Sequence, residues 1–217
     1  MPDHAILKGR AAPLPTPNLD TDQIMPKQFL RGIDKSGLAE GLLYDLRFDG
    51  DGHARSEFVL NQPAYLDVDM LLAGPNFGCG SSREHAVWGL QQFGFKAIVA
   101  SSFAEIFYSN AINNRLLLAT VPPQDAQAFL AEAQEASRPL AMTIDIAART
   151  ARSPQHQAAF TLSDRHQRMA LEGLDMLGAS LNSLPAIQRF AEAHWARAPW
   201  LRDVAARTCA RVDATLP

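Results

Sequence analysis

Residues 74–86 read Gly74-Pro75-Asn76-Phe77-Gly78-Cys79-Gly80-Ser81-Ser82-Arg83-Glu84-His85-Ala86, and this run is the most informative part of the chain. An apolar stretch, residues 68–73, precedes the run, and a helical pattern of apolar residues continues after it to Phe93. This order predicts a strand, a tight loop and a helix over residues 81–93. Alternation of strands and helices is typical of an α/β fold with a parallel sheet.

The chemistry of the run favours binding of an anion. The first N–H groups of a helix have no partner within the helix, and the helix dipole adds partial positive charge there. Gly78 and Gly80 let the backbone adopt conformations closed to other residues, and Arg83 offers a planar fork for a carboxylate. The loop therefore predicts an oxyanion site.

A purely structural interpretation of the same residues stands beside this one. Ser81-Ser82-Arg83-Glu84 has the spacing of a capping box, with Ser81 as the N-cap and Glu84 reaching back from the third helical position. His85 lies four residues after Ser81 and is most simply a packing residue. Glu84 and His85 are therefore interpreted as structural or capping residues.

Other catalytic motifs fit the run less well. Neither serine has glycines at the offsets of a nucleophile elbow, and no lysine follows Gly80 as a phosphate-binding loop requires. Cys79 near a helix start, with His85 close by, is a weaker alternative as an activated thiolate.

The pattern of the rest of the sequence supports an α/β domain. Pro122-Pro123 begins a helix after a turn, and residues 49–53 read as a polar surface loop. Strands are expected at residues 6–9, 68–73, 97–100, 116–121 and 142–146, with helices at 81–93, 103–112 and 124–136.

Composition sets the bounds on function. The chain has 217 residues, 47% of them hydrophobic, a net charge of −3 and a pI near 6.1, so one substantial core is expected and nucleic acid is not a partner. No signal peptide or membrane-spanning stretch is expected, and two cysteines fit a reducing compartment. These features predict a cytoplasmic protein.

Residues 76–86 resemble the signature of the small subunits of 3-isopropylmalate dehydratases and of the swivelling domain of the wider aconitase family. Further matches extend the resemblance, in order, over about residues 5–193. They are Asn18-Leu19-Asp20-Thr21-Asp22-Gln23-Ile24, Pro26-Lys27-Gln28-Phe29-Leu30, Gly94-Phe95-Lys96, Ser102-Phe103-Ala104-Glu105-Ile106-Phe107 and Leu171-Glu172-Gly173-Leu174-Asp175. The resemblance implies a single compact swivelling β/β/α domain over residues 1–194, with residues 195–217 as a C-terminal extension of unknown role.

The resemblance also implies roles for individual residues. Ser81 corresponds to the base that removes the proton next to a substrate carboxylate, and Asp22 to an aspartate of the same active site. Ser82 and Arg83 correspond to residues that bind substrate carboxylate oxygens, beside Gly80 in the same loop. A serine can act as a base only if its alkoxide is stabilised by nearby donors and a cation.

Arg31 follows Pro26-Lys27-Gln28-Phe29-Leu30, where aconitase-like relatives approach the variable group of the substrate. It is a candidate for binding a distal carboxylate, with a solvated loop cation as the equal alternative. Apolar Ile33 and Leu38 suit an isopropyl group, which favours 2-isopropylmalate over homocitrate, citrate or dimethylmalate.

The chain is expected to bind no metal or cofactor itself. An iron–sulfur cluster requires several cysteine thiolates, and Cys79 and Cys209 are the only cysteines in the sequence. The resemblance therefore implies a 4Fe–4S cluster on a large partner subunit, in a heterodimer or heterotetramer acting on a small hydroxy-dicarboxylic acid in leucine biosynthesis. A related hydro-lyase subunit of the citraconate, dimethylmalate or homoaconitate type and a non-catalytic anion-binding module remain as alternatives.

Overall fold

The computed structural model describes residues 5–30 and 36–214, and it divides into a unit that ends at Asp175 and a unit that begins at Met176. The first unit contains β1 (Ile6–Leu14), α1 (Thr21–Ile24), η1 (Lys27–Phe29), α2 (Leu38–Gly41), α3 (Tyr44–Arg47), η2 (Val59–Asn61), η3 (Pro63–Tyr65), β2 (Met70–Ala73), α4 (His85–Phe93), β3 (Ala97–Ala100), α5 (Glu105–Asn113), β4 (Leu117–Thr120), α6 (Pro123–Ala136), β5 (Leu140–Asp145), β6 (Thr150–Arg152), β7 (Gln157–Ala159) and α7 (Asp164–Glu172).

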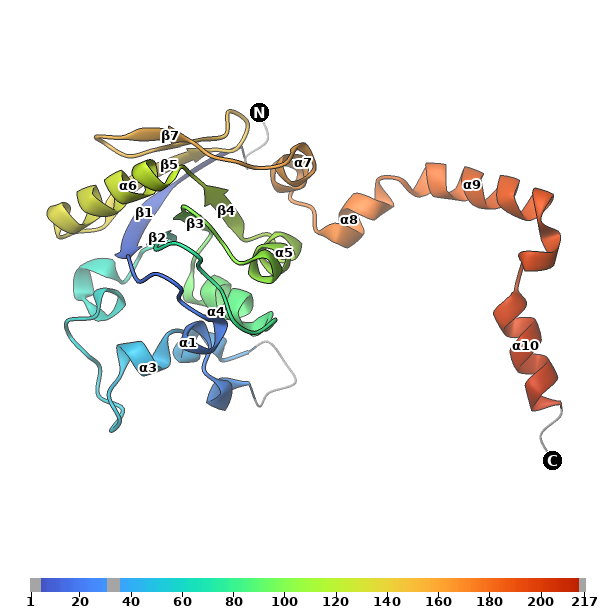
Figure 1. Ribbon diagram of the computed structural model, residues 1–217, viewed down its shortest axis with the longest axis horizontal. Coiled ribbons are helices and arrows are strands. Elements are labelled where there is room, and N and C mark those ends of the chain that lie inside the picture. The colour runs from blue at the N-terminus through green and yellow to red at the C-terminus, as the bar shows by residue number, and fades with distance from the viewer. Residues whose placement is uncertain (1–4, 31–35, 215–217) are drawn as a thin grey trace. The chain divides into compact units, whose positions relative to one another are not determined.

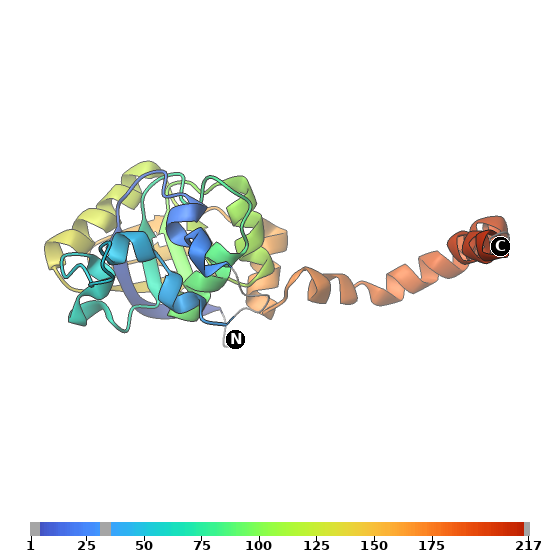
Figure 2. The same ribbon diagram turned by 90° about the horizontal axis from the view of Figure 1, so that it is seen from below.

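A seven-stranded sheet with the order β4-β3-β2-β1-β5-β6-β7 forms the centre of this unit (Figures 1 and 2). Strands β1 to β4 are parallel, with Leu14 of β1 opposite Ala73 of β2, whereas β5, β6 and β7 pair antiparallel. The carboxyl ends of β1 and β2 therefore lie together at one edge of the sheet. In open α/β sheets this edge is where ligands bind.

Helices cover both faces of the parallel half of the sheet. Leu71 and Ala73 belong to one buried cluster with Val87 and Leu90 of α4. Side chains alternate along a strand, so neighbouring Met70 faces the other side, where it is also fully buried. On that side α6 packs across β1, β2 and β3, as Figure 1 shows. Burial on both faces explains why these strands read as continuous apolar runs.

The α/β class and the expected strand-helix alternation are confirmed, with three corrections. Strand β5 is antiparallel to β1, although a strand after a helix was expected to be parallel; α6, which leads to it, crosses β3, β2 and β1 and also contacts β5. The first strand continues through Pro13 to Leu14, although proline disfavours a strand interior. Helix α4 begins at His85 and not at residue 81.

The second unit contains α8 (Met176–Leu181), α9 (Leu184–Arg197), η4 (Pro199–Leu201) and α10 (Val204–Asp213). None of these four elements contains a buried residue. The compact first unit ends at Asp175, and the domain boundary expected after residue 194 stays a prediction. No helix in the described part of the chain has both the length and the apolar character needed to cross a membrane.

Candidate functional site

The glycine-rich loop follows the carboxyl end of β2 and has an unusual backbone. Gly78 and Gly80 have φ angles of 79° and 91°, in the left-handed region that favours glycine. A Cβ atom on Gly78 would lie 2.2 Å from Cγ of buried Phe107. Both the conformation and the space therefore require glycine at position 78.

Backbone hydrogen bonds attach this loop to the segment that follows β1. The N–H of Gly78 donates to the carbonyl oxygen of Leu19 at 2.8 Å, and the N–H of Thr21 donates to the carbonyl oxygen of Cys79 at 2.8 Å. The two segments lie far apart in the sequence, but β1 and β2 are neighbours in the sheet. The parallel pair thus brings the two loops into contact.

Asp20 fixes the start of α1 within this segment. Its Oδ1 atom accepts hydrogen bonds from the N–H groups of Asp22 and Gln23, each at 2.8 Å, and Gln23 Oε1 accepts from the N–H of Asp20 at 3.2 Å. This is a complete capping box, and it sets the position of Asp22 in the first turn of α1.

Four side chains meet where the two loops join. The hydroxyl of Ser81 donates to Asp22 Oδ1 at 3.3 Å, and Nη1 of Arg83 lies 2.6 Å from the same Oδ1 atom. Thr21, which is 1% exposed, donates from its hydroxyl to the carbonyl oxygen of Ser81 at 2.9 Å and lies 3.1 Å from Ser81 Oγ. Asp22 is therefore shared between a hydroxyl and a guanidinium.

Arg83 is held in the site by charge more than by a directed hydrogen bond. Its side chain is 28% exposed, and its Nη1 atom is buried. Although Nη1 lies close to Asp22 Oδ1, the two groups are not aligned as donor and acceptor of a hydrogen bond. A buried donor without a well-aligned acceptor is unfavourable. A carboxylate arriving beside Ser81 and Ser82, both of which are exposed, would supply that acceptor.

The prediction that Ser81 and Glu84 form a capping box is wrong. Helix α4 starts at His85, Glu84 occupies its N-cap position, and no side chain caps it. The carboxylate of Glu84 instead accepts from the side-chain amide of Asn114 at the end of α5. Because Ser81 precedes the helix, its hydroxyl is available to the site and not to the helix backbone.

The remaining predicted residues lie around this cluster. His85 packs against Trp88 with ring centroids 4.7 Å apart and the rings tilted by 57°, and the Cys79 thiol donates to the carbonyl oxygen of Asn18 at 3.2 Å. Ser82 and Gly80 adjoin Ser81 in the loop. Arg31, like Ile33, lies outside the described residues.

Leu38, which we expected to suit an isopropyl group, is 3% exposed and belongs to the core cluster. In the described part of the chain it is a packing residue.

Sequence reasoning gave no role to Thr21, to Asn110 of α5 or to Asn114, which follows the last residue of that helix. Asn110 donates from its amide to the carbonyl oxygen of Ser82 at 3.3 Å, and Asn114 accepts from the indole N–H of Trp88 at 2.9 Å. The position of Thr21 between Asp20 and Asp22 was the available signal for it. The sequence gives no such signal for the two asparagines, because their hydrogen-bond partners are about thirty residues away along the chain.

The chain does not offer the ligands of an iron–sulfur cluster. Such clusters are held by several cysteine thiolates. The two cysteines of the sequence, Cys79 and Cys209, belong to different units, and the Cys79 thiol donates a hydrogen bond to the carbonyl oxygen of Asn18. The residues of this chain therefore do not fit a cluster of their own.

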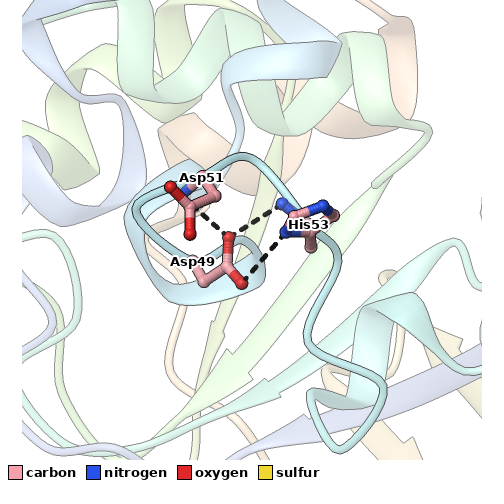
Figure 3. A group of neighbouring side chains, drawn as sticks. All are labelled: Asp49, Asp51 and His53. Carbon is pink, nitrogen blue, oxygen red and sulfur yellow. Dashed lines mark hydrogen bonds and ion pairs between the residues drawn. The ribbon is translucent and has the colours of Figure 1, made fainter.

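One further group of metal-ligand type occurs in the exposed loop after α3, formed by Asp49, Asp51 and His53 (Figure 3). Asp49 Oδ1 accepts from the N–H groups of Asp51 and His53 at 3.0 and 2.8 Å, which closes a tight turn. The hydrogen bond from the His53 backbone lowers the pKa of Asp49. These contacts explain the group as a turn, and they confirm the predicted surface loop.

This fold, with its glycine-rich loop at the carboxyl ends of parallel strands, defines an α/β domain of the aconitase C-terminal type. The model of the aconitase C-terminal domain family matches residues 1–124. Among similar proteins, the 3-isopropylmalate dehydratase small subunit 1 of Chromobacterium violaceum is 58% identical over 205 residues, covering 94% of this chain and 96% of its own. The small subunit of the same name from Caulobacter vibrioides is 44% identical over 196 residues, covering 90% and 96%.

A solved structure agrees with these relatives. The crystal structure of 3-isopropylmalate dehydratase from Methanocaldococcus jannaschii is 29% identical and has a TM-score of 0.61, covering 86% of this chain and 99% of its own. The chain belongs to the family of 3-isopropylmalate dehydratase small subunits.

Proposed function

We propose that this chain is the small subunit of a heteromeric hydro-lyase that isomerises 2-isopropylmalate to 3-isopropylmalate through isopropylmaleate, in leucine biosynthesis. The observation that carries the proposal is the meeting of Ser81, Asp22 and Arg83 at the loop of a chain from this family. Removal of a proton next to a carboxylate requires a base, a hydrogen-bond acceptor for that base and a cation, and Ser81, Asp22 and Arg83 are proposed for these three roles in this order.

Ser81 is the proposed base. In its alkoxide form, Ser81 takes the proton from the substrate carbon next to a carboxylate and becomes the neutral hydroxyl, and the hydroxyl group on the neighbouring carbon leaves as the double bond forms. Rehydration then adds a hydroxyl to the carbon that lost the proton, and Ser81 returns the proton to the carbon that lost the hydroxyl, which gives the isomer. Arg83 stabilises negative charge on the serine oxygen, and the Thr21 hydroxyl, which donates to the carbonyl oxygen of Ser81 at 2.9 Å, fixes the position of Ser81.

Arg83 and Ser82 are the proposed carboxylate ligands. Arg83 Nη1 is buried without a well-aligned acceptor, so a substrate carboxylate would complete its hydrogen bonding while Asp22 keeps the side chain in place. Gly80 would let the substrate approach the backbone, because it has no Cβ atom. Arg31 remains a proposed contact to the variable end of the substrate.

The other half of the site belongs to a partner. Since the chain has no ligand set for a cluster, we propose that a large subunit carries a 4Fe–4S cluster, which supplies the Lewis acid for the leaving hydroxyl. The exposure of Ser81 and Ser82 fits a site that is completed at an interface. We propose that the complex is a cytoplasmic heterodimer or heterotetramer.

A substrate panel tests the proposal. The full chain is co-expressed anaerobically with the large subunit from the same source, and formation of the unsaturated product is followed by absorbance for 2-isopropylmalate, 3-isopropylmalate, homocitrate and dimethylmalate. The proposal expects turnover of both isopropylmalates and little of the others. Turnover of homocitrate or dimethylmalate alone would favour a related hydro-lyase, and stable assembly without any turnover would favour an anion-binding module.

A further inference from the structure

The second unit of the chain exposes far more apolar surface than the first. Ten of the thirteen exposed large hydrophobic residues among the described residues lie after Asp175. They are Met176, Leu177, Leu181, Leu184, Ile187, Phe190, Trp200, Leu201, Val204 and Val212. With none of α8, α9, η4 and α10 holding a buried residue, this unit has no core of its own.

Helix α9 carries three of these exposed residues, Leu184, Ile187 and Phe190, and its partly buried Ala191 and Trp195 lie on the same side. Leu184, Ile187, Ala191 and Trp195 recur at spacings of three and four, which places them on one stripe of the helix. Phe190 borders this stripe, is 69% exposed and stacks on His194 with ring centroids 5.7 Å apart. We call these five residues, Leu184, Ile187, Phe190, Ala191 and Trp195, the apolar face of α9.

Such a helix needs a surface to pack against. Helices of this length are marginal in water when isolated, and most helical stability in proteins comes from packing an amphipathic face. The ten side chains are 40–69% exposed, so at roughly 200 Å² each they offer on the order of 1,000 Å² of surface in all, which compares with about 800 Å² per partner in a stable interface. The surface is therefore large enough for stable association.

The charge of the unit indicates the character of that surface. Residues 176–217 contain five arginines and three acidic residues, a formal charge of +2 in a chain whose total is −3. Arg197, at the end of α9 and seven residues after Phe190, lies on the side of the helix that carries Phe190. An apolar groove with acidic residues at its rim would match this pattern.

We propose that the apolar face of α9 docks into such a groove on the large subunit, so that residues 176–217 are an assembly segment separate from the catalytic loop. The choice of occupant rests on the proposed function, which makes a large subunit an obligatory partner of this chain. The catalytic loop and the assembly segment lie in different units of the chain, so they can be altered independently.

The test measures the affinity of the full chain for its large subunit in two matched variants. Phe190→Asp places a charge on the apolar face, whereas Ala196→Asp places the same charge at an exposed position on the opposite side of α9. Phe190→Asp is expected to raise the Kd at least about 30-fold, the loss typical of an interface hot spot, and Ala196→Asp to leave it nearly unchanged. Because Phe190 is exposed in the free chain, the first unit should keep its melting temperature in both variants.

Light scattering on the free chain distinguishes the alternatives. The proposal would be overturned if Phe190→Asp left the Kd for the large subunit unaltered. It would also be overturned if the wild-type chain self-associated, the Phe190→Asp variant were monomeric, and both bound the large subunit with the same Kd. In the latter case a second copy of this chain would cover the face. Failure of the wild-type chain itself to bind the large subunit would refute the proposed function, an outcome that no α9 variant could produce.

Discussion

Substitution of Gly78 by alanine tests whether the loop geometry of the site is built into the fold. Gly78 has φ 79°, and an added Cβ would meet Phe107 Cγ at 2.2 Å and its Cβ at 2.6 Å. Phe107 is 2% exposed and packs edge-on against Phe77 with centroids 5.3 Å apart, so it has little room to move. The left-handed conformation costs about 1–2 kcal/mol and overpacking about 1–3 kcal/mol, so Gly78→Ala should lower the free energy of unfolding by about 2–5 kcal/mol.

Gly37 provides the matched control. Its φ angle is 72°, but a Cβ there would meet nothing within 4 Å. Gly37→Ala should therefore cost only the conformational term of about 1–2 kcal/mol. Both variants restrict the unfolded chain equally, so that effect cancels. Urea unfolding followed by circular dichroism measures the two; equal losses of stability would refute the argument that Phe107 confines the loop.

Three further predictions concern the site and the first unit. Thr21→Val should lower kcat about tenfold with little change in KM, because Ser81 loses a positioning hydroxyl, whereas Thr21→Ser, which keeps the hydroxyl, should restore most of the activity in the same steady-state assay. Arg83→Lys keeps the charge but loses the fork, so kcat/KM should fall about 10²-fold, and a variant that binds and turns over substrate normally would contradict the carboxylate role. Burial lowers the pKa of His166, with Arg165 adding to the effect, so the unfolded chain binds a proton at this histidine more readily than the folded chain. Thermal melts should therefore show the stability falling as the pH drops below about 6.5, and this fall should be smaller in His166→Gln.

The sequence predicted the elements that local patterns determine. The strand at residues 97–100 was predicted at its observed bounds, because four apolar residues between polar neighbours leave little ambiguity. The glycine, serine and arginine pattern of residues 78–83 pointed to the site, and the structure brings Ser81, Arg83 and Asp22 together.

What the sequence did not predict depends on contacts between distant residues. The short strands β6 and β7 exist only because each pairs with a neighbour, and their sequences are not strongly strand-forming. The spacing of Ser81 and Glu84 satisfied a local capping rule, but Asn114 binds the Glu84 carboxylate and Thr21 binds Ser81. Tertiary hydrogen bonds therefore outweighed the local motif in this loop.

The amphipathic pattern of α9 was visible in the sequence, yet its apolar residues look like ordinary core residues until the structure shows them exposed. The exposure of this face, in contrast to its pattern, was therefore not predictable from the sequence.

The most direct test of the central claim is the turnover of Ser81→Ala in the assembled complex. The control is Ser56→Ala, which removes an exposed hydroxyl outside the site. With assembly verified by light scattering, Ser81→Ala should form isopropylmaleate from 2-isopropylmalate about 10²–10⁴-fold more slowly than the wild type, the usual contribution of a positioned base, and the control should match the wild type. Unchanged turnover in the assembled Ser81→Ala complex would show that this serine is not the base.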